Sequence, residues 1–153
     1  MSYVDSSLMP GETVKWRTQL HKIMFVVPSI LAIGVAIVGF WLFHKGFDAI
    51  YTGLSIIIAL IILLPACIKY TTSEFAVTNK RVIVKIGFIQ RQTMETLLQK
   101  IEAISVDQTV LGRILNYGTI SIIGTGGTKE SFVNIANPLD FRRSIQEQTD
   151  ANA

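Results

Sequence analysis

The sequence predicts an α+β protein that joins a two-helix transmembrane hairpin to a small antiparallel β domain closed by one C-terminal helix. Three observations support this prediction. Residues 23–68 hold two apolar runs with a short polar break between them. After Tyr70, apolar and polar residues alternate with the period of a β-strand. From Asn137, the chain carries the residue types that start a helix.

The composition agrees with a membrane chain that has one modest domain outside the bilayer. Of 153 residues, 50% are hydrophobic and only 16% are charged, whereas ordinary soluble domains are roughly 25% charged. The net charge of +3 is mild and no aromatic-and-basic RNA-binding pattern is present, so nucleic acid is not an expected partner. The one cysteine, Cys67, lies in the second apolar run, where a lone thiol acts as a small hydrophobe.

The two apolar runs, 23–43 and 49–68, are each about long enough to cross the roughly 30 Å of bilayer hydrocarbon as a helix. No charge interrupts either run. We expect a retained anchor rather than a cleaved signal peptide, because the first run is too long and no cleavage site of small residues follows it. The segment 1–22 precedes the hairpin, and within it residues 12–19 alternate loosely enough to predict a short strand.

Charges on either side of the hairpin predict its orientation. The connecting loop carries Lys45 alone, beside Asp48. Basic residues flank the outer ends of both runs, namely Lys15, Arg17 and Lys22 before the first, and Lys69, Lys80, Arg81 and Lys85 after the second. The positive-inside rule therefore predicts that both termini are cytoplasmic.

Small residues recur at a four-residue spacing in both runs, at Ala32 and Ala36 and at Ser55 and Ala59. This spacing lets helix backbones approach closely. Two interpretations stay open, packing within the hairpin and contact between protomers. Because two lone helices bury little surface, and the edge strands of a sheet offer a second contact, we expect a homo-oligomer of undetermined copy number.

Residues 69–150 predict one β domain. Tight turns or glycine-rich loops lie at 79–80 and 124–128, and residues 110–115 form a short helical or irregular link. Asn137 as N-cap, Pro138 at the first helical position and Asp140 in the first turn predict the closing helix. The predicted strands are 74–78, 81–86, 90–96, 101–107, one around 120–122 and 131–134.

The chain resembles the bacterial pleckstrin-homology-like (PH-like) membrane proteins of the second class, a former domain of unknown function. The segments that carry the resemblance are 10–12 (PGE), 78–83 (TNKRVI), 106–108 (VDQ), 111–119 (LGRILNYGT), 124–128 (GTGGT) and 137–142 (NPLDFR). The resemblance implies a PH-like fold, a seven-strand antiparallel barrel or sandwich capped by the helix, in a bacterial inner membrane. It implies no single activity, because this fold serves many binding roles.

Four basic residues around one predicted hairpin are the best binding candidates, Lys80, Arg81, Lys85 and Arg91. In eukaryotic relatives of the fold, basic residues near the first hairpin bind inositol phospholipids, which most bacteria are not expected to contain. We predict contact with anionic membrane lipids in general. A solvated hairpin face without a ligand is the other interpretation.

Nothing in the sequence predicts catalysis, a metal or a cofactor. The two histidines, His21 and His44, flank the hairpin on opposite sides of the predicted membrane. The loop 124–128 lacks the Lys-Ser/Thr ending of a phosphate-binding P-loop, which favours a flexible hairpin. Four carboxylates, Glu95, Glu102, Asp107 and Glu130, have no metal-ligand spacing.

The leading functional hypothesis is a non-enzymatic, membrane-anchored scaffold or interaction module on the cytoplasmic face. The alternative is a subunit of a small transporter, a channel or an export-related complex. That alternative predicts polar or ionisable residues within the spans. The polar residues there are only Ser29, Thr52 and Ser55.

Overall fold

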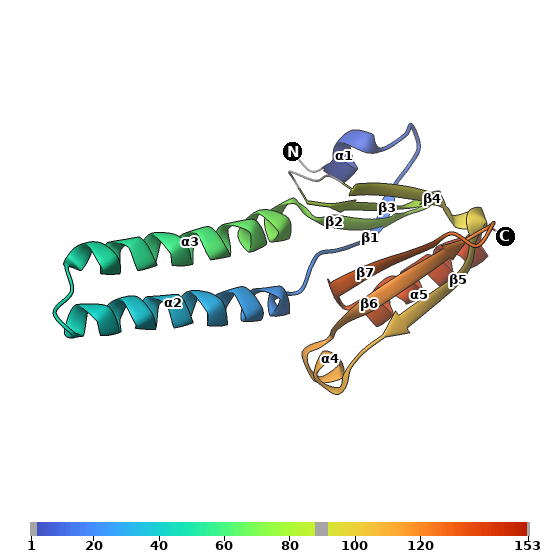
Figure 1. Ribbon diagram of the computed structural model, residues 1–153. Coiled ribbons are helices and arrows are strands. Elements are labelled where there is room, and N and C mark those ends of the chain that lie inside the picture. The colour runs from blue at the N-terminus through green and yellow to red at the C-terminus, as the bar shows by residue number, and fades with distance from the viewer. Residues whose placement is uncertain (1–2, 88–91, 153) are drawn as a thin grey trace. The chain divides into compact units, whose positions relative to one another are not determined.

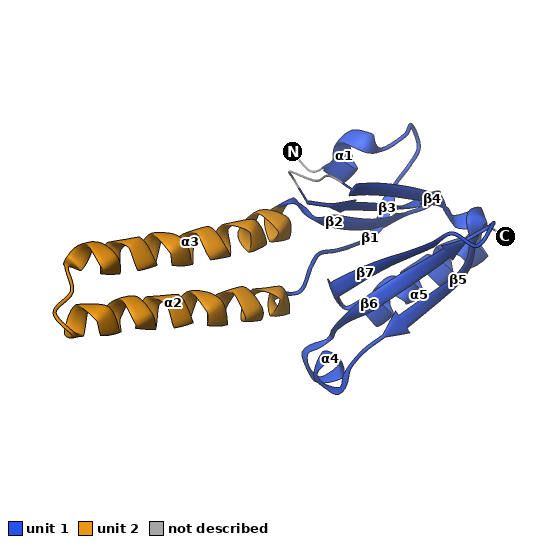
Figure 2. Ribbon diagram, viewed as in Figure 1, with its two compact units in different colours: residues 1–21, 72–153 blue, residues 22–71 orange. Residues whose placement is uncertain are grey.

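The computed structural model describes residues 3–87 and 92–152, and the chain divides into two compact units (Figure 1, Figure 2). One unit, the β domain, is built from residues 1–21 and 72–153. The other, the hairpin, is residues 22–71. The β domain is therefore formed by two chain segments that the hairpin separates in sequence.

Seven strands in the described part of the chain form two antiparallel sheets. The first sheet has the order β1-β2-β3-β4 and the second β5-β6-β7. The strands are β1 (Val14–Thr18), β2 (Glu74–Thr78), β3 (Arg81–Ile86), β4 (Gln92–Leu97), β5 (Ile101–Asp107), β6 (Tyr117–Gly124) and β7 (Lys129–Ala136). The predicted α+β class is confirmed, and the sheets form an open sandwich rather than a closed barrel.

Strand β1 connects the two sheets on one side of the sandwich. It pairs with β2, which places Thr18 opposite Phe75. Just beyond its end, Leu20 bridges Ile135 of β7, and the amide of Ala136 donates to the carbonyl of Gln19 at 3.0 Å. The segment before the hairpin thus belongs to the β domain.

The main core lies between the sheets under helix α5 (Pro138–Ala151). The Phe75 ring of β2 meets the Phe132 ring of β7 edge-on at a centroid distance of 6.0 Å and the Phe141 ring of α5 at 6.5 Å. Phe141 and Ile145 of α5 are both fully buried. Aromatic edge-to-face packing at these distances is favourable beyond the area it buries.

The N-terminal segment covers the outer face of the first sheet. Helix α1 (Tyr3–Ser7) places the buried side chain of Val4 against Ala76 and Ile83. The β2 and β3 side chains are therefore buried on both faces, which explains why Ala76, Val77, Val82 and Ile83 have no exposed area. The sequence predicts no element at residues 3–7, because this short helix has only one buried apolar residue.

The remaining elements of the β domain are short. A 3₁₀ turn, η2 (Leu98–Lys100), joins the sheets, and the predicted link is a helix, α4 (Val110–Leu115). Asn137 precedes α5 as predicted, but its backbone is left-handed with φ 50° and its side chain makes no cap hydrogen bond. Its side-chain oxygen instead accepts from the Asn116 amide at 2.6 Å. Asn137 is therefore the N-cap residue by position, as predicted, while its side chain makes a contact with Asn116.

The hairpin consists of a 3₁₀ turn, η1 (Lys22–Phe25), and two helices, α2 (Val26–His44) and α3 (Ala49–Thr72). The candidate spans, Lys22–His44 and Ala49–Thr72, are long and apolar enough to cross a membrane. Most of their large apolar side chains are exposed in the chain itself. The Phe25 and Tyr70 rings, at the ends of the two helices away from the connecting loop, are 5.3 Å apart.

Candidate functional site

The predicted basic residues do not form one exposed surface in the described part of the chain. Lys80 lies at the turn before β3 and Lys85 near the end of that strand, a separation of about 17 Å at the rise of a β-strand. Lys85 pairs in register with Glu74, two residues after α3 ends at Thr72. Arg91 lies outside the described residues. Of the described candidates, Lys85 is therefore the one paired with the segment that follows α3 along the chain. Its contact with lipid stays a prediction.

Arg81 is buried, with 6% of its surface exposed. Its guanidinium makes a two-point contact with Glu12, with Nε to Oε1 and Nη2 to Oε2 both at 2.9 Å. Nη1 donates to Glu95 at 2.6 Å and Nη2 donates to the carbonyl of Ser7 at 2.7 Å. These contacts hold the N-terminal segment to the first sheet, so Arg81 has a structural role that sequence analysis did not predict.

Glu12 is the central acceptor of this cluster. Besides Arg81, it accepts a hydrogen bond from the Thr78 hydroxyl at 2.7 Å and from the Met9 amide at 2.8 Å. Burial acts to raise the pKa of Glu12, but the bonds from Arg81, Met9 and Thr78 outweigh it and hold the pKa below its ordinary range. The same pairing raises the pKa of Arg81. Both groups are therefore charged at neutral pH, as a satisfied buried pair requires.

The small residues of the hairpin fall on two different faces. Ala32 and Ser55 are buried between the helices, Ala59 is half-buried, and Ala36 is exposed. The close approach is at Gly39, which sequence analysis did not single out. A Cβ added there would lie 1.9 Å from the Ser55 hydroxyl oxygen and 2.5 Å from its Cβ. Ala32 and Ser55 thus pack within the hairpin, while Ala36 stays available to a neighbour.

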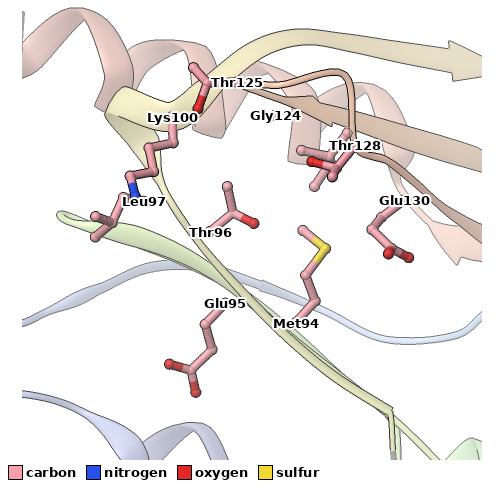
Figure 3. A pocket seen from close by; sticks show the side chains of 10 residues that line it. Met94, Glu95, Thr96, Leu97, Lys100, Gly124, Thr125, Thr128 and Glu130 are labelled. Carbon is pink, nitrogen blue, oxygen red and sulfur yellow. The ribbon is translucent and has the colours of Figure 1, made fainter.

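A pocket of about 460 Å³ opens between β4 and the β6–β7 hairpin. Figure 3 shows Met94 and Thr96 of β4 directed into it and Glu95 directed the other way, in keeping with the alternation of a strand. The residues that line it are Met94, Glu95, Thr96, Leu97, Lys100, Ile122, Gly124, Thr125, Thr128 and Glu130. Its size falls within the range of ligand pockets.

The glycine-rich loop at the rim of this pocket forms a hairpin turn rather than a phosphate cradle. Its amides are used internally. The Gly124 amide donates to the Thr128 carbonyl at 3.0 Å, and the Gly127 amide donates to the Gly124 carbonyl at 3.1 Å. The Thr125 amide donates to the Lys100 carbonyl at 2.9 Å. Gly126 and Gly127 have φ of 99° and 78°, a backbone that favours glycine. Three of the loop's donors are therefore not directed at a ligand.

The two histidines lie in different units of the chain. His21 belongs to the β domain, where its ring stacks on Tyr117, and His44 ends α2 in the hairpin. Within residues 3–87 and 92–152, no group of three His, Cys, Asp or Glu side chains is placed to hold a metal ion. The buried carboxylate, Glu12, is already saturated by internal donors.

A two-sheet antiparallel sandwich closed by a C-terminal helix is a PH-like domain, and here it carries two helices able to span a membrane. The family model for the bacterial PH domain matches residues 23–149. This match covers most of the chain and includes the hairpin, so the protein belongs to the bacterial PH domain family. No curated protein and no solved structure matches it.

Proposed function

We propose that this protein is a non-enzymatic, membrane-anchored PH-like module that presents its β domain at the cytoplasmic face of a bacterial inner membrane as a scaffold or interaction surface. PH-like domains are generally non-catalytic. The described side chains form a pocket of ligand size and a structural ion cluster, and no group of them is placed to hold a metal ion. Recognition is therefore the role that the geometry supports best.

One observation carries the membrane part of the proposal. Strand β1 precedes the hairpin and strand β2 follows it, yet the two pair directly, with Thr18 opposite Phe75. Both ends of the hairpin must consequently connect to the same sheet. If the two apolar helices cross a bilayer, they cross it in opposite directions and leave the β domain on one side.

Charge and hydrogen bonding favour the cytoplasmic side and an anchor rather than a transport path. The basic residues Lys15, Lys22 and Lys69 lie near the ends of the helices that join the β domain, whereas Lys45 lies in the loop.

The Thr52 hydroxyl donates to the Gly39 carbonyl at 3.3 Å and the Ser55 hydroxyl to the Thr52 carbonyl at 2.8 Å. These polar groups are used in packing the hairpin, so they do not favour a transporter or channel.

Paired C-terminal fusions test the topology. We expect a fluorescent-protein fusion to be bright, an alkaline phosphatase fusion to be inactive, and both to remain in the membrane fraction after alkaline washing. An active phosphatase fusion would place the β domain outside the cytoplasm. Release of the chain by the alkaline wash would refute the membrane anchor itself.

Site-specific photo-crosslinking in native membranes tests the recognition role. A crosslinker at Thr125, on the pocket rim, is compared with one at Glu147, which is exposed on α5. We expect a discrete adduct from Thr125 that is absent from Glu147. Equal labelling at both positions, or none from the pocket, contradicts the assignment of this pocket as the interaction surface.

A further inference from the structure

Helix α4 leaves nearly all of its apolar side chains uncovered. Val110 is 76% exposed, Leu111 61%, Ile114 73% and Leu115 45%. A helix in a folded domain normally buries its apolar residues against another element. Four large exposed apolar side chains within six residues therefore mark a contact surface.

The backbone of α4 is nevertheless held firmly. The Thr109 hydroxyl accepts from the Gly112 amide at 3.0 Å, and the Gln108 side chain donates to the carbonyls of Gly112 at 3.3 Å and Tyr117 at 3.0 Å. A Cβ at Gly112 would lie 2.6 Å from the Tyr117 carbonyl oxygen, so only glycine permits this close approach. The fold fixes the helix and directs its apolar side chains outward.

The position of α4 within the β domain indicates what covers it. Tyr117, two residues after α4, stacks on His21 with ring centroids 5.1 Å apart and an interplanar angle of 21°. The next residue, Lys22, is the first residue of the first candidate span, and its Cα lies about 3.8 Å from that of His21. The C-terminal end of α4 is thus two residues away from a side chain that stacks on the last residue of the β domain before the hairpin.

We propose that α4 is a second membrane contact, which inserts Val110, Leu111 and Ile114 into the headgroup region of the bilayer that holds the hairpin. The proposal rests on the function proposed above, since it requires the hairpin to be embedded. Arg113 is the one charged residue of α4 and is exposed. An apolar helix with a cation and no carboxylate is complementary to an anionic lipid surface.

The test places a polarity-sensitive fluorophore on single cysteines of the full chain reconstituted in vesicles with anionic lipid. Cys67, the one native cysteine, is first replaced by alanine. The three labelled variants are Ile114→Cys on α4, Thr128→Cys as an exposed control and Leu60→Cys within α3. Thr128 adjoins the far end of β6 from Tyr117, about 23 Å away along the strand.

We expect lipids with shallow nitroxide groups to quench the label at Ile114 and to leave that at Thr128 unchanged, while deep nitroxides quench the label at Leu60. Quenching at Leu60 without quenching at Ile114 would overturn this inference and leave the membrane anchor intact. No quenching at Leu60 would refute the anchor and the inference together. A blue shift at Ile114 that depends on protein concentration and not on nitroxide lipid would show a protein contact instead, which also overturns it.

Discussion

Replacing Glu12 by alanine should release the N-terminal segment from the first sheet. The substitution removes two of the four described hydrogen bonds of the Arg81 guanidinium and its fully buried counter-charge. Glu95 remains as a partner, but its side chain is 34% exposed. The acceptor of the Met9 amide and the Thr78 hydroxyl disappears at the same time.

The expected loss of stability follows from the burial of the pair. Breaking a buried ion pair by removing one partner destabilises a protein by about 3–5 kcal/mol. Because Glu95 still neutralises part of the Arg81 charge, we expect about 3 kcal/mol, the lower end of this range. A change of that size raises the population of the open segment on the order of 100-fold.

Hydrogen exchange on the full chain in detergent micelles measures this opening directly. The amides of Val4 and Thr13 report it, because they donate to Glu74 and to Asn79 across the interface with the sheet. The matched control is Asp5→Ala, which removes the exposed pair of Asp5 with Arg17, with side chains 55% and 47% exposed. That change should cost less than about 1 kcal/mol.

Equal protection in the Glu12→Ala and Asp5→Ala proteins would refute the reasoning, since it would mean that the buried cluster holds the segment no better than a surface pair. A double variant, Glu12→Gln with Arg81→Met, provides a further check. Removing both charges should restore much of the protection, because no unpaired charge is left buried. Protection lower than in either single variant would contradict this account.

Three further predictions concern pH, the hairpin and self-association. The folded state holds the pKa of Glu12 below its ordinary value. The Glu12 carboxylate therefore stabilises the folded state fully above about pH 4.3, and this stabilisation is lost as the pH falls through the lower, folded-state pKa. Acid titration of segment opening should show this loss in the wild type and not in Glu12→Gln. Gly39→Ala should weaken the packing of the two hairpin helices by about 1–3 kcal/mol, which is measured as faster helix separation in micelles. Gly34→Ala should leave the packing unchanged, because a Cβ at Gly34 would meet nothing within 4 Å. If the protein is a homo-oligomer, Ala36→Leu should lower the mass of the solubilised assembly and leave the hairpin intact; an unchanged mass would exclude this face as the contact between protomers.

Much of the architecture was predictable from the sequence because its signals are local. Each candidate span is one uninterrupted apolar run, and the strands after Tyr70 show their alternation within a few residues. Pro138 and Asp140 mark the start of α5 in the same way. The α+β class and the helical hairpin are consequently determined by neighbouring residues along the chain.

The tertiary structure alone decided how these elements combine. Arg81 looked like a solvated strand residue, yet its burial depends on Glu12, which lies 69 positions earlier in the sequence, before the hairpin. Gly39 became a packing residue only when Ser55 was placed against it. The exposure of Ile114 likewise depends on what the rest of the fold leaves uncovered around α4. Periodicity reports which way a side chain points relative to its neighbours along the chain, but the group that meets it is supplied by a distant segment.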